Sequence, residues 1–148
     1  MNAHSKIRST PWPPRALLGE AEKKAVDALF DRAIASGQAF GYNGAEEEAL
    51  CRQFAASMGG GYADGVNSGT SAVYVALRAL DLEPFSEVIV SPITDPGGIM
   101  PIPLLNCIPV VADAAPGSFN TGPDQVAARI TPRTRAILVA HVMGEPAD

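Results

Sequence analysis

The chain has 148 residues, of which 47% are apolar and 18% are charged, and its formal net charge is -5 at pH 7. A chain of this length can bury about two thirds of its unfolded surface, and its composition is unlike that of disordered proteins. The negative charge argues against nucleic acid or an anionic membrane as a partner, and no apolar run approaches the roughly 18 residues that span a bilayer. We therefore expect a soluble globular protein.

The start of the chain, MNAHSKIRSTPWPPR, contains charges and prolines but no apolar run of the kind found in secretory signals. The two cysteines, Cys51 and Cys107, have no metal-ligand spacing and suit reduced packing residues better than a disulfide framework. These observations predict a cytoplasmic protein without a metal site.

Residues 1–18 predict an extended arm, because their three prolines disfavour a helix. Residues 19–36 place apolar side chains at helical spacing with charged side chains between them, which predicts an amphipathic helix. A loop rich in glycine at 37–44 separates it from a second helical pattern, which ends at three glycines at 59–61.

The rest of the chain alternates between strand and helix patterns. We expect strands at 62–67, 87–91, 108–113 and 135–142, and helices at 70–80, 98–106 and 123–130, the second of them bent by prolines. The last strand, RAILVAHV, is almost continuously apolar, which favours burial on both faces. The alternation predicts an α/β domain with a mostly parallel sheet.

The turn before the helix at 70–80 has the composition of an anion site. Ser68, Gly69, Thr70 and Ser71 combine small size with hydroxyl groups at a helix start, where free N–H groups attract a phosphate. Ordinary N-capping by serine or threonine explains the same residues, and both interpretations stay open at this point. A P-loop does not fit, because it requires a lysine that residues 65–70 lack. The helix that follows is apolar almost all round, which predicts that it is sandwiched in the core.

Three stretches in order resemble the DegT family of aminotransferases that depend on pyridoxal 5'-phosphate (PLP): NSGTSAVYVALRALDLEP, EVIVSPIT and NCIPVVADAAPGSFNTGPDQVAARITPRTRAILVAHVMGEPAD. The resemblance covers residues 19–148. It implies an α/β fold, that of the large domain of fold-type I PLP-dependent transferases, with a mostly parallel sheet between helices. It also implies that residues 19–148 are the amino-terminal portion only, and that the enzyme is a homodimer.

For the turn, the resemblance implies that Gly69, Thr70 and Ser71 hold the PLP phosphate while Ser68 shapes the turn. After the segment 92–94, where the family usually has an aromatic residue that stacks on the pyridine ring, this chain has Asp95. An aspartate offers no π-face, so Asp95 either contacts the cofactor or substrate in another way or caps the following helix.

PLP catalysis needs a lysine amine for the Schiff base and a carboxylate paired with the pyridinium nitrogen. The three lysines, Lys6, Lys23 and Lys24, lie in the arm or on the polar face of the first helix. The resemblance places both catalytic groups after Asp148. We therefore expect no catalytic residue in these 148 residues, an inactive isolated chain, and the rest of the large domain and the small C-terminal domain to be absent.

The activity that the resemblance implies is transfer of an amino group from an amino acid to a keto-sugar or keto-cyclitol. Two alternatives stay open: a PLP-dependent sugar dehydratase of the same fold, and a non-catalytic truncated binding module. A partial sheet exposes an apolar edge, so we also expect the isolated chain to associate with itself.

A few other residues deserve a weaker functional interpretation. His141 and Asp113 each follow a predicted strand, where catalytic groups collect, although structural hydrogen bonds or turns explain them equally well. The run Glu46–Glu48 suits the first turn of a helix. Trp12 is either a dimer anchor or a plug for an apolar notch.

Overall fold

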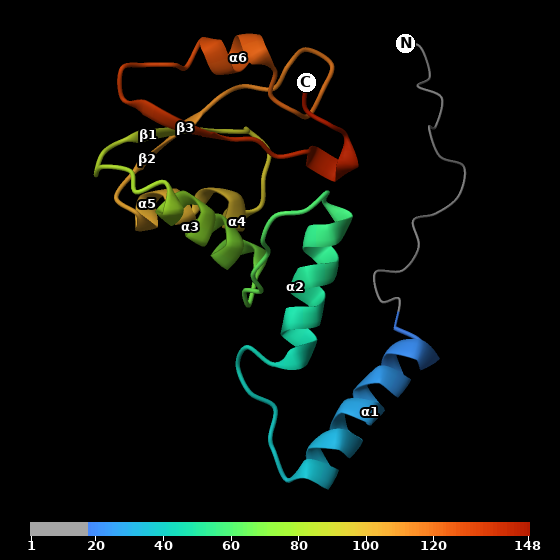
Figure 1. The fold of residues 1–148 in the computed structure, drawn as a ribbon. Coiled ribbons are helices and arrows are strands. Elements are labelled where there is room, and N and C mark those ends of the chain that lie inside the picture. The colour runs from blue at the N-terminus through green and yellow to red at the C-terminus, as the bar shows by residue number, and fades with distance from the viewer. Residues whose placement is uncertain (1–17) are drawn as a thin grey trace, which may run out of the picture. The chain divides into compact units, whose positions relative to one another are not determined.

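The computed structural model describes residues 18–148 (Figure 1), so Trp12, Lys6 and nearly all of the predicted arm at 1–18 lie outside the described residues. The chain divides into two compact units, with the boundary between Ala63 and Asp64. Within the described residues, no helix combines the length and apolar character needed to cross a membrane.

Within residues 18–63, the described part of the first unit, there are two helices, α1 (Glu20–Ser36) and α2 (Ala45–Ser57), as the helical spacing predicted. An ion pair between Arg32 and Glu46 joins α1 to the start of α2. The rings of Phe30 and Phe40 pack edge to face, with centroids 5.1 Å apart. The predicted run of glutamates, 46–48, lies in the first turn of α2, where carboxylates oppose the positive end of the helix dipole.

The second unit alternates helix and strand. Its elements are α3 (Gly69–Ala79), β1 (Glu87–Val90), α4 (Pro96–Ile99), α5 (Pro101–Leu104), β2 (Ile108–Val111), α6 (Pro123–Ala127), β3 (Thr134–Leu138) and a 3-10 turn (Val142–Gly144). The bent helix expected at 98–106 is therefore two short helices, with the break before Pro101. The strand expected at 62–67 is wrong, because Asp64 and Gly65 disfavour strands and no described strand pairs with them.

The three strands form one parallel sheet in the order β2-β1-β3. All four residues of the central strand β1 are buried. In Figure 1 the strands lie between α6 on one side and the group α3, α4 and α5 on the other. The carboxyl ends of all three strands therefore meet at one edge of the sheet, which is where ligands bind in open α/β sheets.

The core forms where α3 and α5 meet the central strand. Its buried members are Leu77, Val88, Val90, Ile102 and Cys107. The sequence-based expectation of a buried packing role is therefore confirmed for Cys107, whereas Cys51 is only half-buried.

Two expectations of burial are wrong. Leu77 is the one buried residue of α3, and Val75 is 53% exposed, because the described residues cover this helix on one face only. Burial in β3 alternates, and Ile137 is 49% exposed, because β3 is an edge strand with one described neighbour. The apolar edge expected of a partial sheet is present at Val111, Ile137 and Val139.

Candidate functional site

A pocket of about 380 Å³ lies at the carboxyl ends of β1 and β3. Three segments form it: the start of α3, the end of β1 with the loop into α4, and the end of β3. The lining residues are Gly69, Thr70, Val73, Val90, Ser91, Thr94, Asp95, Gly97, Gly98, Leu138, Val139 and Ala140. Of the five residues predicted for the site, the structure places Gly69, Thr70 and Asp95 in this lining, and Ser68 and Ser71 beside it.

Ser68 and Ser71 hold the start of α3 in place. The Oγ of Ser68 accepts a hydrogen bond from the Ser71 N–H at 3.1 Å, which makes Ser68 the N-cap residue. The Ser71 hydroxyl donates to Oδ1 of Asn67 at 2.6 Å, and the two serine hydroxyls lie 3.0 Å apart. The capping interpretation is therefore correct for Ser68, whereas the Ser71 hydroxyl bonds to the side chains of Asn67 and Ser68, and both serines shape the turn.

The next two residues leave donors free. Neither the N–H of Gly69 nor that of Thr70 has a hydrogen-bond acceptor within residues 18–148, as expected for the first turn of a helix. A Cβ added to Gly69 would meet nothing within 4 Å. The first turn of α3 thus presents open space and unpaired N–H groups with a partial positive charge to the pocket.

Gly97 lets the two helix starts approach each other. A side chain at this position would overlap the hydroxyl of Thr70 and lie 2.9 Å from Oδ1 of Asp95. The backbone of α4 can therefore pack directly against the Thr70 side chain, which closes one wall of the pocket. Position 97 must remain glycine for this contact to exist.

Asp95 acts as the N-cap of α4. Its Oδ1 accepts a hydrogen bond from the Gly97 N–H at 2.7 Å, and Pro96 begins the helix. The capping role that the sequence left open for Asp95 is thus present, and the same residue lines the pocket.

Ser91 joins the two strands at the floor of the pocket. It is 3% exposed, its Oγ accepts a hydrogen bond from the Ala140 N–H at 3.0 Å, and its own N–H donates to the Leu138 carbonyl oxygen at 3.3 Å. Sequence reasoning missed Ser91 as a site residue. Its position directly after a buried strand was the available signal, because strand ends carry ligand contacts in such sheets.

His141 and Asp113 do not line this pocket. The Nδ1 atom of His141 accepts a hydrogen bond from the Ala147 N–H at 2.9 Å, and the Asp113 carboxylate accepts one from Ala114 at 2.8 Å. Both side chains therefore have the structural roles that the sequence offered as the alternative. Among residues 18–148 the lysines are Lys23 and Lys24, both in α1.

Comparison with known proteins identifies the family. Over its full length the chain is 32% identical to the 3-amino-5-hydroxybenzoate synthase of Amycolatopsis mediterranei, covering 36% of that protein. Over 93% of its length it is 36% identical to the dTDP-4-dehydro-2,6-dideoxy-D-glucose 3-dehydratase of Saccharopolyspora spinosa, covering 30% of it. The chain thus spans about a third of the length of these relatives.

A solved structure shows the same fold. The crystal structure of S. venezuelae DesV in complex with a ketimine intermediate superposes with a TM-score of 0.77 and 36% identity, over 87% of this chain and 34% of that one. The predicted fold class, that of fold-type I PLP-dependent transferases, is confirmed. The family model described as the DegT/DnrJ/EryC1/StrS aminotransferase family matches residues 20–148, and the chain belongs to this family.

Proposed function

We propose that the chain forms the cofactor-phosphate part of a PLP-dependent aminotransferase that passes an amino group from an amino acid to a keto-sugar or keto-cyclitol. The observation that carries the proposal is the first turn of α3, where two N–H groups without an acceptor among residues 18–148 and an open glycine face a 380 Å³ pocket. A phosphate monoester fits this turn, because it is small, dianionic and rich in acceptor oxygens.

In this proposal, two residues of the turn contact the phosphate and two others hold the turn in shape. Gly69 and Thr70 donate their N–H groups to the phosphate, and the Thr70 hydroxyl, which has no partner among residues 18–148, supplies a third donor. Ser68 and Ser71 do not contact the phosphate but hold the turn in shape, because their hydroxyls already bond to each other and to Asn67. This assignment moves Ser71 from direct phosphate contact to support.

Asp95 takes the place where family members usually carry a ring-stacking aromatic residue. Its Oδ1 is engaged in the cap of α4, and Oδ2 has no described donor. In our proposal this second oxygen accepts a hydrogen bond from the cofactor or from a substrate hydroxyl. The apolar side chains of Val73, Leu138 and Val139 would then hold the ring in place of a stacking aromatic residue.

PLP, when bound, would supply the electron sink for amino transfer. The protein part described here binds and orients its phosphate end. No lysine lines the pocket among residues 18–148, so we expect the 148-residue chain alone to bind PLP without turnover. We further expect a cytoplasmic homodimer, and we assign residues 19–148 to one PLP-binding domain.

A sugar dehydratase is the second candidate. It is favoured by the 36% identity to a dTDP-sugar 3-dehydratase. The pocket described here serves either reaction, because both need the cofactor phosphate held in the same way. Because we expect no turnover from these 148 residues alone, assays of amino transfer and of sugar dehydration would have to use a longer protein that contains this chain, and there they would distinguish the two reactions.

The binding proposal is tested with Gly69→Val. The added side chain enters open space and should not disturb the fold, but it occupies the place of the phosphate. We expect PLP affinity, measured by equilibrium dialysis, to fall by about tenfold or more, which corresponds to about 1.4 kcal/mol of binding free energy. Gly41→Val is the matched control, because a side chain there also meets nothing within 4 Å. Equal affinity for wild type and Gly69→Val would overturn the proposal.

A further inference from the structure

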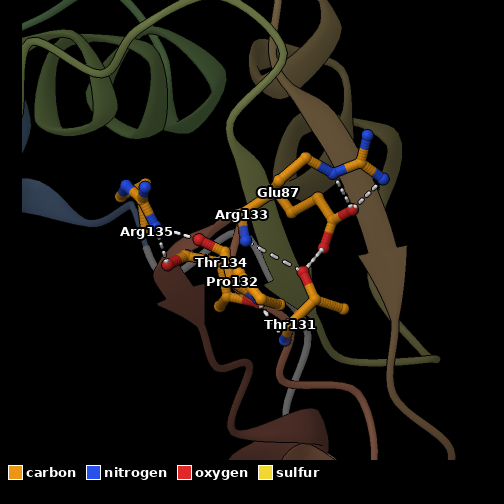
Figure 2. Close-up of polar contacts among 6 residues, drawn as sticks. All are labelled: Glu87, Thr131, Pro132, Arg133, Thr134 and Arg135. Carbon is orange, nitrogen blue, oxygen red and sulfur yellow. Dashed lines mark hydrogen bonds and ion pairs between the residues drawn. The ribbon is translucent and has the colours of Figure 1, made fainter.

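A buried carboxylate lies at the opposite end of β1 from the pocket. Glu87 begins the strand and is 4% exposed. Its Oε2 accepts a hydrogen bond from the Thr131 hydroxyl at 2.5 Å, and its Oε1 accepts from Nε and Nη2 of Arg133 at 2.9 and 2.5 Å (Figure 2). Both carboxylate oxygens are therefore paired, as burial of a charge requires.

The two partners come from one tight turn before β3. The Thr134 N–H donates to the Thr131 carbonyl oxygen at 3.0 Å, and the Thr131 N–H donates to the Thr134 hydroxyl at 2.9 Å. Pro132 occupies the second position of this turn, where its fixed φ is favoured. The turn is thus closed by two hydrogen bonds of its own, and it places a hydroxyl and a guanidinium against the Glu87 carboxylate.

An irregularity in strand pairing follows immediately. Glu87 pairs with Thr134, but the next residue of β1, Val88, pairs with Ala136, so Arg135 is an extra residue in β3. The Arg135 guanidinium donates to the carbonyl oxygens of Pro132 and Thr134, at 2.8 and 3.0 Å (Figure 2). Two sets of hydrogen bonds therefore stabilise the bulge: those of the Glu87 carboxylate with Thr131 and Arg133, and those of the Arg135 guanidinium with the backbone.

The bulge decides which side chains of β3 face the core. Beyond it, Ala136 and Leu138 pack against the core, while Ile137 is 49% exposed. A shift of one residue in a strand exchanges the two faces completely. Without the bulge, Ile137 would point inward, and the segment that follows β3 would reach the pocket one residue out of place.

The end of β3 and the residues that follow it are part of the pocket. Leu138, Val139 and Ala140 line the pocket, and the Ala140 N–H donates a hydrogen bond to Ser91 at the end of β1. The distance from Glu87 to Ser91 along the strand is about 13 Å, at roughly 3.3 Å per residue. The register set at one end of β1 therefore fixes the position of the pocket wall at the other.

We infer that Glu87, Thr131 and Arg133 form a register clamp, which positions the end of β3 and thereby the wall of the cofactor pocket. These are positioning residues, because none of them lines the pocket. The effect on ligand binding rests on the proposed function, whereas the effect on strand register does not.

The test compares Glu87→Gln with Val110→Ala. Val110 lies on β2, pairs with Ile89 on the other side of β1 and does not line the pocket, so its truncation weakens the same sheet without touching the clamp. Hydrogen exchange is measured residue by residue at the Ser91 and Ala140 amides, and each rate is normalised to the variant's free energy of unfolding from urea denaturation. Affinity for PLP is measured in parallel by equilibrium dialysis.

We expect exchange at Ser91 and Ala140 in Glu87→Gln to exceed that in Val110→Ala by about tenfold or more, and PLP affinity to fall by a similar factor in Glu87→Gln alone. Equal normalised exchange in the two variants would overturn the clamp. So would unchanged PLP affinity in Glu87→Gln when wild type binds. If wild type itself does not bind PLP, the proposed function fails and the exchange rates still decide the clamp.

A second pair of variants covers a failure of Glu87→Gln to fold. Thr131→Val removes the clamp hydroxyl and keeps the charge pair, whereas Thr131→Ser keeps both. We expect faster exchange at Ser91 and Ala140 in the valine variant and near wild-type rates in the serine variant. The same rates in both would overturn the inference.

Discussion

The two ends of β1 differ in how their polar groups are satisfied. At the amino end, the Glu87 carboxylate is buried, and both of its oxygens accept hydrogen bonds, from the Thr131 hydroxyl and the Arg133 guanidinium. At the carboxyl end, the neighbouring helix α3 leaves the N–H groups of Gly69 and Thr70 without an acceptor among residues 18–148. A polar group paired within the protein holds the fold, whereas an unpaired donor beside a pocket is available to a ligand.

The largest effect on stability is expected from Arg133→Ala. Arg133 is itself exposed, but its removal leaves the carboxylate of Glu87 buried without its cation, and breaking such a pair costs far more than loss of a surface contact. Urea denaturation should show a large loss of stability. The control is Arg129→Ala on the exposed segment after α6, which should have little effect; a loss of the same small size in both variants would contradict the comparison.

Ser91→Ala tests the other end of the strand. It removes the acceptor for the partly buried Ala140 N–H and should lower the free energy of unfolding by about 1 kcal/mol, the lower end of the effect of leaving a buried donor unpaired. Because Ser91 lines the pocket, PLP affinity should fall as well. Affinity that is unchanged while stability falls would show that the strand end does not shape the site.

Phe85→Gly should stabilise the chain. Phe85 has a φ of 66° and is 70% exposed, a strained conformation for a bulky residue at the entry to β1. Glycine adopts this φ without strain, so we expect a gain of about 1 kcal/mol in the free energy of unfolding, reduced in part by the greater backbone entropy of glycine when unfolded. Denaturation in urea measures it, and a loss of stability would mean that contacts of the Phe85 ring outweigh the strain.

The smallest expected effect is a change in pH dependence. The hydrogen bond from Thr131, together with the Arg133 guanidinium, lowers the pKa of Glu87 from its ordinary value of 4.5 despite the opposing effect of desolvation. A carboxylate with a lowered folded-state pKa stabilises the fold fully above the unfolded value, and this contribution is lost as pH falls through the folded value. Stability should therefore fall below about pH 4.5, and less steeply in Glu87→Gln, as urea denaturation at pH 3 to 7 would show. Identical slopes would contradict a charged Glu87.

The sequence predicted the elements that have strong local signals. The spacing of apolar residues gave α1 and α2, and β-branched runs gave β1 and β2. Burial of α3 and β3 was predicted wrongly. Apolar composition shows that a segment can be buried, but it does not show whether another layer of the protein covers that segment. The prediction of a strand at 62–67 was wrong because Asp64 and Gly65 disfavour strands and no described strand pairs with this segment.

Only part of the candidate site could be predicted from the sequence. The turn at Ser68–Ser71 was visible because its glycine and hydroxyls are consecutive in the chain. Ser91 and Ala140 were not, since they are 49 residues apart and meet only through the parallel pairing of β1 with β3. The clamp was missed for the same reason: a glutamate at the start of a strand is expected to be exposed, and its partners lie 44 and 46 residues away.

The most direct test of the central claim follows the amide signals of Gly69 and Thr70 by NMR during titration with PLP and, separately, with pyridoxal, which lacks the phosphate. If the first turn of α3 binds the phosphate, saturating PLP should shift both amide signals strongly and slow the exchange of these amides with solvent. Pyridoxal should leave both signals close to their positions in the free protein. Bound PLP with both amides unmoved would contradict the account.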